Sequence, residues 1–253
     1  MIIKRPGAED IPALRSLWQN AFGDTDWFLD QFFSKAFHPD RCLCAWEDSR
    51  LQGAVYWFDC SCAEEKLAYI YALAVEESQR GRGTGSCLMA RAHTLLARQG
   101  YSGVLLVPQE EDLRRLYERL GYLDGPHQST LSAVAALDPV PLYPVEVEEY
   151  ALLRKNYLPQ NAVVQEGENM AFLQTQARFY RGANFLLAAR QKGQTLYGLE
   201  LLGDAGAAGG ILQTLACEKG LFRTPGNDTR FAMFLPLKEE ARRPAYFAFA
   251  FDL

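Results

Sequence analysis

The chain has 253 residues, which allows one large domain or two small ones. A hydrophobic content of 49% and a charged content of 23% are typical of a globular protein. The net charge of −5 disfavours broad nucleic-acid binding, and the apolar runs are well under 18 residues, so no membrane span is expected. At the start, Lys4 and Arg5 follow the apolar residues, unlike the order in a signal peptide, so a cytoplasmic location is the default expectation.

The first 62 residues predict a strand, two helices and a hairpin. Apolar residues recur at helical spacing in 9–22 and again in 25–37, and the second segment is rich in aromatic residues. Two Cys-x-Cys pairs, 42–44 and 60–62, fall on adjoining strands. A four-thiolate zinc site is conceivable, but zinc more often takes pairs spaced by two to four residues, so we expect buried free thiols and no metal.

The segment 79–86 is the most informative one in the chain. An apolar strand, 67–75, precedes it and a helical pattern, 86–99, follows it. Gly83 and Gly85 permit a tight turn whose backbone N–H groups face an anion at the helix start, and Arg80 and Arg82 add positive charge.

Two other kinds of glycine turn fit the segment poorly. No Lys follows Gly85, which excludes a Walker-type loop, and the dinucleotide fingerprint fails because position 88 is Leu. A nucleotide-binding domain of another fold is the third and least favoured interpretation of this segment.

A buried strand, 103–107, and a helix that ends at Gly121 follow the glycine turn. Together, Arg80-x-x-Gly83-x-Gly85 and Leu116-Tyr117-x-x-x-Gly121-Tyr122 resemble the GNAT superfamily of acyl-CoA-dependent N-acyltransferases. The resemblance covers roughly residues 1–130. It implies an α/β fold of the α+β kind, in which helices flank a mixed, mostly antiparallel sheet, and acetyl-CoA as the cosubstrate.

The resemblance also implies roles for individual residues. Tyr117 stands where the family usually has the tyrosine that protonates the leaving thiolate, whereas Glu110 replaces an asparagine that the family often has. Two segments would bind the cofactor, a strand end for the pantetheine arm and the turn for the pyrophosphate. Their residues are Leu73, Ala74, Val75, Arg80, Gly81, Arg82, Gly83, Thr84, Gly85 and Ser86.

The general base and the acceptor pocket are less well specified. Glu76 and Asp59 are the preferred acids because adjacent strand ends converge on clefts. Tyr69 and Tyr71 could line the acceptor pocket, and in this family the two N-terminal helices lie beside it. Their aromatic residues suggest a hydrophobic or cationic acceptor. Ordinary core packing and solvated strand ends are the alternatives for these residues, and His93 is expected on the surface.

The second half is expected to begin after a proline-rich linker. We predict a GNAT acetyltransferase domain at 1–135, the linker at 136–146 and a second domain at 147–253. In that domain we expect helices at 148–158 and 170–180, and a hairpin of 185–190 with 195–202. The order strand, glycine turn, helix and strand recurs at 195–240, which suggests a second, degenerate GNAT-like copy in which 231–240 parallels 104–111.

The C-terminal end and the overall function complete the predictions. Residues 246–252 read as a half-buried strand, and the carboxylate of Leu253 is a further candidate base. The leading hypothesis is direct transfer of acetyl from acetyl-CoA to a primary amine of a small molecule or peptide. The alternative is an acyl-CoA-binding regulatory or scaffold protein with little turnover. A homodimer is left open.

Overall fold

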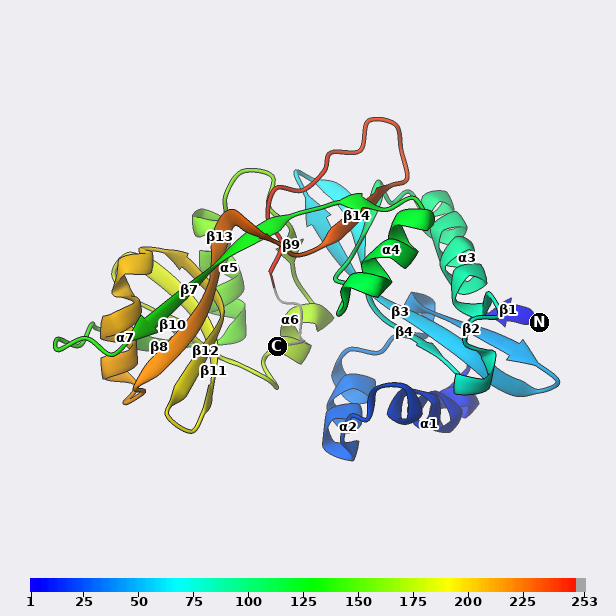
Figure 1. The fold of residues 1–253 in the computed structure, drawn as a ribbon, viewed down its shortest axis with the longest axis horizontal. Coiled ribbons are helices and arrows are strands. Elements are labelled where there is room, and N and C mark those ends of the chain that lie inside the picture. Colours follow the sequence, from blue (N-terminus) through cyan, green and yellow to red (C-terminus); the bar gives the residue numbers. More distant parts are fainter. Residues whose placement is uncertain (249–253) are drawn as a thin grey trace. The chain divides into compact units, whose positions relative to one another are not determined.

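The computed structural model describes residues 1–248, and the chain divides into two compact units (Figure 1). The first comprises 1–123 and 233–242; the second comprises 124–232 and the residues from 243 onward. This division differs from the expected one of 1–135, 136–146 and 147–253. The boundary lies earlier because the strand after it already pairs within the second unit, and the chain later returns to the first.

The first unit is a mixed sheet with helices on both faces. Its strands lie in the order β1-β2-β3-β4-β5-β14-β6. The pair β4–β5 is parallel, and the pairs β1–β2, β2–β3, β3–β4 and β5–β14 are antiparallel. Helices α1 and α2 cover one face and α3 and α4 the other (Figure 1). The strands are β1 (Ile2–Lys4), β2 (Cys42–Glu47), β3 (Arg50–Cys62), β4 (Glu65–Val75), β5 (Gly103–Leu106), β6 (Leu123–Asp124) and β14 (Met233–Pro236). The helices are α1 (Ile11–Phe22), α2 (Asp26–Lys35), α3 (Thr84–Arg98) and α4 (Glu111–Arg119).

Local sequence explains the turns and ends of these elements. Asp48 and Ser49 both have positive φ in the β2–β3 turn, which is the two-residue geometry that matches strand twist. Thr25 caps α2, because its Oγ1 accepts a hydrogen bond from the Phe28 N–H at 3.3 Å. Gly23 ends α1 in the left-handed conformation, φ 73°. Such signals make the early elements predictable.

Strand β14 shows that the expected parallel between 231–240 and 104–111 is wrong. The segment does form a strand, but it pairs antiparallel with β5, from Met233 opposite Leu106 to Pro236 opposite Gly103. Phe234 lies directly over Gly103, where an added Cβ would be 2.3 Å from the Phe234 ring. The first unit is therefore completed by residues from near the end of the chain.

The second unit has its own mixed sheet, in the order β7-β13-β12-β11-β10-β8. Only β12 and β13 run parallel. The strands are β7 (His127–Val134), β8 (Tyr143–Val145), β10 (Arg178–Arg181), β11 (Phe185–Lys192), β12 (Thr195–Gly203) and β13 (Lys219–Arg230). The two-residue strand β9 (Val164–Gln165) lies outside this sheet. The helices are α5 (Val147–Tyr157), α6 (Glu168–Leu173) and α7 (Ala208–Thr214).

The predicted elements of the second half are partly confirmed. Helix α5 and the β11–β12 hairpin lie where they were expected. The helix expected at 170–180 is wrong in its second half, because α6 ends at Leu173 and β10 follows. Prolines 139, 141 and 144 lie within the second unit. Residues 249–253, which include most of the expected last strand and Leu253, lie outside the described part of the chain.

The two sheets share one strand pattern. In the first unit, β4 pairs with β5 over 67–70, and Tyr71 is an extra residue relative to β3. In the second, β12 pairs with β13 over 195–198, and Leu199 is an extra residue relative to β11. Helix α3 links the parallel pair of the first unit, and α7 links that of the second. Residues of the two sheets can therefore be matched by their strand register. Among residues 1–248, no helix is long and apolar enough to span a membrane.

Candidate active site

The site begins where strands β4 and β5 part. Their parallel ladder ends at Ile70 opposite Leu106, although β4 continues to Val75. The extra residue Tyr71 interrupts the β3–β4 register at the same point, and such a bulge bends the strand. Residues 71–75 therefore turn backbone groups toward a side of β4 that β5 does not cover. The predicted cofactor residues Leu73, Ala74 and Val75 all lie in this segment.

The glycine turn follows directly and leads into α3. Gly81 and Gly83 adopt the left-handed conformation, with φ of 75° and 87°. An added Cβ at either glycine would meet no atom within 4 Å, so conformation and not crowding favours glycine there. Gly85 has room as well, because its added Cβ would make ordinary contacts of 3.5 and 3.6 Å with Val75 and Leu73. The outer side of the turn is therefore open.

Backbone amides at this turn fall into two groups. The N–H groups of Arg80 and Arg82 already donate to the carbonyls of Glu77 and Gln79, at 3.1 and 3.3 Å. The first bond of α3 runs from Cys87 to Gly83, at 2.9 Å, so the amides of residues 84–86 have no α-helical partner. Of the predicted stretch 80–86, the helix start is thus the part that is best suited to an anion.

The two arginines of the turn differ in their surroundings. The Nε of Arg80 donates to the Val75 carbonyl at 3.3 Å, which ties the turn to the end of β4. Arg82 is exposed, and its charge lies beside the positive end of the α3 dipole. Both positions fit the neutralisation of a phosphate group.

Tyr117 lies on the inner face of α4. Its ring belongs to the buried cluster that also contains Ile70 and Leu106, the last pair of the β4–β5 ladder. Its pKa is raised to about 12 because burial disfavours the phenolate. Tyr117 therefore holds its proton at neutral pH next to the place where the strands part, as a general acid must.

Asp59 and Glu76 are not brought together. Asp59 lies opposite Ala68 on β4, whereas Glu76 follows Val75. Eight residues of strand separate these positions, roughly 25 Å. The two candidates cannot act on one amine at the same time.

Asp59 has partners that sequence reasoning missed. Its Oδ1 accepts a hydrogen bond from the Tyr101 hydroxyl, and its Oδ2 lies 3.6 Å from Arg41. The pKa of Tyr101 is raised above its ordinary range, by burial first and then by its hydrogen bond to the Asp59 carboxylate. The ammonium group of Lys66 lies 3.9 Å from the centre of the Tyr101 ring. Tyr101 is 42 positions from Asp59, so no local pattern could have revealed this pair.

Glu76 lies at the other end of the strand. It lines an open cavity of about 680 Å³ with the β2–β3 turn and with Gln52, Ser78 and Gln79. The Glu76 N–H donates to the Gln52 carbonyl at 2.9 Å. This position is beside the glycine turn and not beside Tyr71.

Aromatic side chains fill the face of the sheet below α1 and α2. Trp18, Phe32 and Tyr56 are buried, and Tyr71 packs against Phe32 and Phe58 with ring centres 5.7 and 5.3 Å apart. The shallow hollow between α2 and β3 leaves no space for a water-sized sphere. Most of the aromatic residues therefore form core, and Tyr71, half-buried, is the one at the strand bulge.

The structure also bears on the expectations for His93, for the paired cysteines and for a metal site. His93 is not on the surface: it is partly buried and its Nε2 lies 2.9 Å from the Tyr122 hydroxyl, a pair 29 positions apart. Cys42 and Cys44 lie 3.8 Å apart by their sulfurs, but the register sets them beside Tyr56 and Ala54, away from Cys60 and Cys62. In residues 1–248, no group of three or more His, Cys, Asp or Glu side chains could hold a metal ion.

Comparisons with known proteins identify the first unit. Residues 3–123 match the family model described as "Acetyltransferase (GNAT) domain". A search of curated proteins finds no match.

Solved structures extend the likeness of the fold across both units. A GCN5-related N-acetyltransferase from Kribbella flavida is similar at a TM-score of 0.73 and 16% identity, over 95% of this chain and 73% of that one. Eis1 from Mycobacterium abscessus gives 0.71 and 14%, over 95% and 75%. A putative acetyltransferase from Pyrococcus horikoshii gives 0.66 and 16%, over 98% and 93%.

The family model and the site agree in position. The matched residues contain the parting of β4 from β5, the glycine turn and Tyr117, and they end with the first of the two segments that make up the first unit. The chain therefore carries, in residues 3–123, a domain of the GNAT acetyltransferase family.

Proposed function

We propose that this protein transfers acetyl from acetyl-CoA directly to a primary amine, on a small molecule or a peptide. The observation that carries the proposal is the opening of the β4–β5 ladder after Ile70, next to a left-handed glycine turn at the start of α3. An open strand edge offers backbone groups to an amide-rich arm, and the helix start offers N–H groups to phosphates. The residues present therefore fit coenzyme A.

The reaction requires mainly alignment and proton transfer. Acetyl-CoA supplies an activated thioester, so the protein has to hold a neutral amine against it. A backbone N–H near Leu73 or Ala74 is suited to polarise the thioester carbonyl, and Tyr117 to give its proton to the departing sulfur. The amine loses one proton as its bond to the acetyl carbon forms.

Asp59 is the better candidate for the proton acceptor. It lies on β3 near the strand bulge and already accepts a hydrogen bond from Tyr101, whereas Glu76 lies at the turn. Arg41, 3.6 Å from the Asp59 carboxylate, would help to hold that side chain in position. Asp59→Asn should slow transfer more than Glu76→Gln does.

Two measurements test the proposal. Calorimetric titration should show saturable binding of coenzyme A and none of NAD or ATP. Release of free thiol from acetyl-CoA should then depend on an amine from a panel of amino acids, polyamines and peptides. Preference for NAD or ATP would contradict the cofactor assignment, and binding without amine-dependent thiol release across the panel would contradict the transfer reaction.

A further inference from the structure

The Asp59 carboxylate is held at both of its oxygen atoms. The hydroxyl of Tyr101 donates a hydrogen bond to Oδ1, and the guanidinium of Arg41 lies 3.6 Å from Oδ2. The side chain of Asp59 is nevertheless 41% exposed, so an amine can approach it. A carboxylate has about four lone-pair positions, so both oxygens can still receive a proton. The partners therefore orient this carboxylate without occupying it fully.

Asp59 shares a face of the sheet with Tyr117. It lies opposite Ala68, and Trp57, two positions earlier, lies opposite Ile70 at the end of the β4–β5 ladder. Side chains of a strand alternate between faces, so Asp59 and Trp57 point to the same face. Trp57 and Tyr117 belong to one buried cluster. Two residues of strand span roughly 7 Å, a distance that one water molecule can bridge between Asp59 and an amine at the parting of the strands.

The position of Tyr101 is fixed by its neighbours. Its ring is buried in the same cluster, and its N–H donates to the Leu96 carbonyl of α3 at 3.1 Å. The next N–H, that of Ser102, donates to the Lys66 carbonyl at 2.8 Å, and the Lys66 ammonium lies 3.9 Å from the centre of the Tyr101 ring. Burial and the hydrogen bond to Asp59 raise the pKa of Tyr101, so its hydroxyl keeps its proton and remains a donor.

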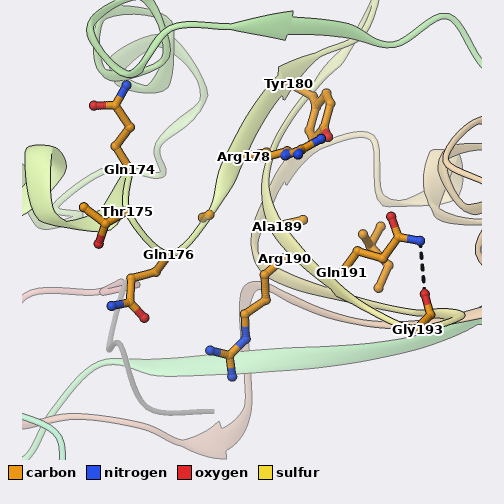
Figure 2. Close-up of a pocket in the computed structure, with 11 residues that line it drawn as sticks. Gln174, Thr175, Gln176, Arg178, Tyr180, Ala189, Arg190, Gln191 and Gly193 are labelled. Carbon is orange, nitrogen blue, oxygen red and sulfur yellow. Dashed lines mark hydrogen bonds between the residues drawn. The ribbon is translucent and has the colours of Figure 1, made fainter. Parts of the chain in front are cut away.

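The second unit builds the same strand arrangement without this pair. Cys217 occupies the place of Tyr101, because its N–H donates to a carbonyl of α7 as that of Tyr101 donates to α3. Gln191 occupies the place of Asp59, because each lies opposite the residue two positions before the end of the parallel ladder. Figure 2 shows the Gln191 side chain turned to the Gly193 carbonyl, to which it donates at 3.1 Å. The fold therefore does not require the Tyr101–Asp59 pair.

We propose that Tyr101 is a positioning residue that orients the Asp59 carboxylate toward the acceptor amine. The proposal rests on the acetyl transfer argued above. Asp59 takes the amine proton as nitrogen bonds to the acetyl carbon, and the departing thiolate takes the proton of Tyr117 as the carbon–sulfur bond breaks. Tyr101 exchanges no proton in either step. It acts by keeping the carboxylate in one orientation.

The test is a double-mutant cycle on thiol release from saturating acetyl-CoA. The acceptor is whichever of spermidine, free lysine and a lysine-containing tripeptide reacts fastest. Tyr101→Phe should lower kcat about tenfold, as expected for one hydrogen bond to a charged group, and leave the KM for acetyl-CoA within about twofold. Asp59→Asn should lower kcat by about 10²–10³-fold. The double variant should match Asp59→Asn within about twofold, because Tyr101 acts only through that carboxylate.

Tyr150→Phe is the matched control. Tyr150 is also buried, and its hydroxyl donates to the Glu200 carboxylate at 2.9 Å in the second unit. The variant loses the same kind of hydrogen bond away from Asp59, so its kcat should stay within about twofold. Thermal unfolding and coenzyme A titration of every variant establish that it is folded.

The outcomes separate this inference from the proposed function. No thiol release with any of the three amines contradicts the transfer reaction and the inference with it. Full kcat in Tyr101→Phe beside a slowed Asp59→Asn overturns the inference alone. So does a double variant slowed by the product of the two single effects, a Tyr101→Phe variant that no longer binds coenzyme A, or an equal loss of kcat in Tyr150→Phe. Full kcat in Asp59→Asn overturns both the choice of base and the role of Tyr101.

Discussion

Tyr117 combines two properties that a general acid needs, a proton at neutral pH and a place beside the opened strands. Burial raises its pKa to about 12, so the neutral form persists far above pH 7. We predict that Tyr117→Phe lowers amine-dependent thiol release by about 10²–10⁴-fold and leaves coenzyme A affinity within about twofold. In the unaltered protein, ionisation of Tyr117 should cause no loss of rate below about pH 10. A Tyr117→Phe variant with full turnover would contradict the assignment.

His93 links pH to stability. Burial lowers its pKa from 6.5 to about 4, so the unfolded chain binds the proton more tightly. Neutral His93 therefore makes its full contribution to the free energy of unfolding above pH 6.5, and this contribution is lost as the pH falls toward 4. From these values, the free energy of unfolding should fall by about 2 kcal/mol between pH 7.5 and pH 5.

The matched variant for this prediction is His93→Gln. Gln can keep a hydrogen bond to Tyr122 but does not titrate, so its stability should change less over the same pH range. Urea unfolding at both pH values measures the difference, and the other histidines cancel in the comparison. Equal pH dependence in both proteins would show that His93 is not responsible.

At the scale of residues, the sequence predicts short motifs but not contacts between residues that are far apart in the chain. The spacing from Arg80 to Gly85 and the position of Tyr117 were readable, because each belongs to a short motif with its own backbone requirement. The pairs Asp59–Tyr101 and His93–Tyr122 were not, since the strands and helices that bring them together are separated in the chain. The burial of His93 follows from that same packing.

Among the elements, α3 and the sheet beneath it offer a matched pair of glycines. At Gly53 an added Cβ would lie 3.0 Å from the Ala74 carbonyl oxygen and 3.0 Å from Leu88, whereas at Gly85 it would make only ordinary contacts. We predict that Gly53→Ala destabilises the first unit by about 1–3 kcal/mol. Gly85→Ala should leave stability nearly unchanged but weaken coenzyme A binding, because a methyl group would stand between the turn and the phosphates.

Urea unfolding and calorimetric titration of both variants check this prediction. Gly53→Ala should lose stability, and Gly85→Ala should lose affinity for coenzyme A. Coenzyme A affinity that is unchanged by Gly85→Ala would mean that the ligand does not approach the backbone there.

In the second unit, a buried ion pair joins α5 to β12. Arg154 donates to Glu200 through Nε at 2.7 Å and Nη2 at 2.9 Å, and the hydroxyls of Tyr150 and Tyr246 donate to the same carboxylate at 2.9 and 3.1 Å. Glu200 is fully buried. Glu200→Gln would leave a buried guanidinium without its counter-charge, so we predict a loss of about 3–5 kcal/mol.

The control and the rescue make this prediction specific. Glu149→Gln alters an exposed pair with Arg181, 3.6 Å apart, and should cost less than about 1 kcal/mol. The double variant Arg154→Met/Glu200→Leu should be more stable than the sum of its single changes, because it removes both charges. Chemical unfolding of the double variant, its two single changes, Glu200→Gln and Glu149→Gln gives the values, and additive losses would argue against coupling.

Elements were predictable where a periodic pattern was long and ended in a clear turn. Helix α3, the strands around it and the β11–β12 hairpin meet that condition. The short α6 and β10 do not, because neither six nor four residues establish a period, and tertiary pairing decides their type. The pairing of β14 could not be predicted for another reason. Its sequence predicts a strand but does not indicate which sheet that strand joins.

At the scale of the whole molecule, the chain leaves the first unit, forms the second and returns to complete the first with β14. Met233 is fully buried in the core cluster of the first unit, and Phe234 covers Gly103 on the neighbouring strand β5. We predict that a fragment of residues 1–135 does not fold cooperatively and does not bind coenzyme A, because it exposes this edge and part of its core. Far-ultraviolet circular dichroism with urea, and calorimetric titration, measure both properties.

A rescued fragment distinguishes loss of this strand from loss of the second unit. The Gly125 N–H donates to the Ala232 carbonyl at 3.0 Å, so the two chain segments run side by side there and a short glycine-containing turn can replace 126–231. The joined chain 1–125 and 232–242 restores β14 beside β5 without the second sheet. It should regain cooperative unfolding and coenzyme A binding. If fragment 1–135 behaves as well as the joined chain, β14 is dispensable; if neither folds, the first unit depends on the second for more than one strand.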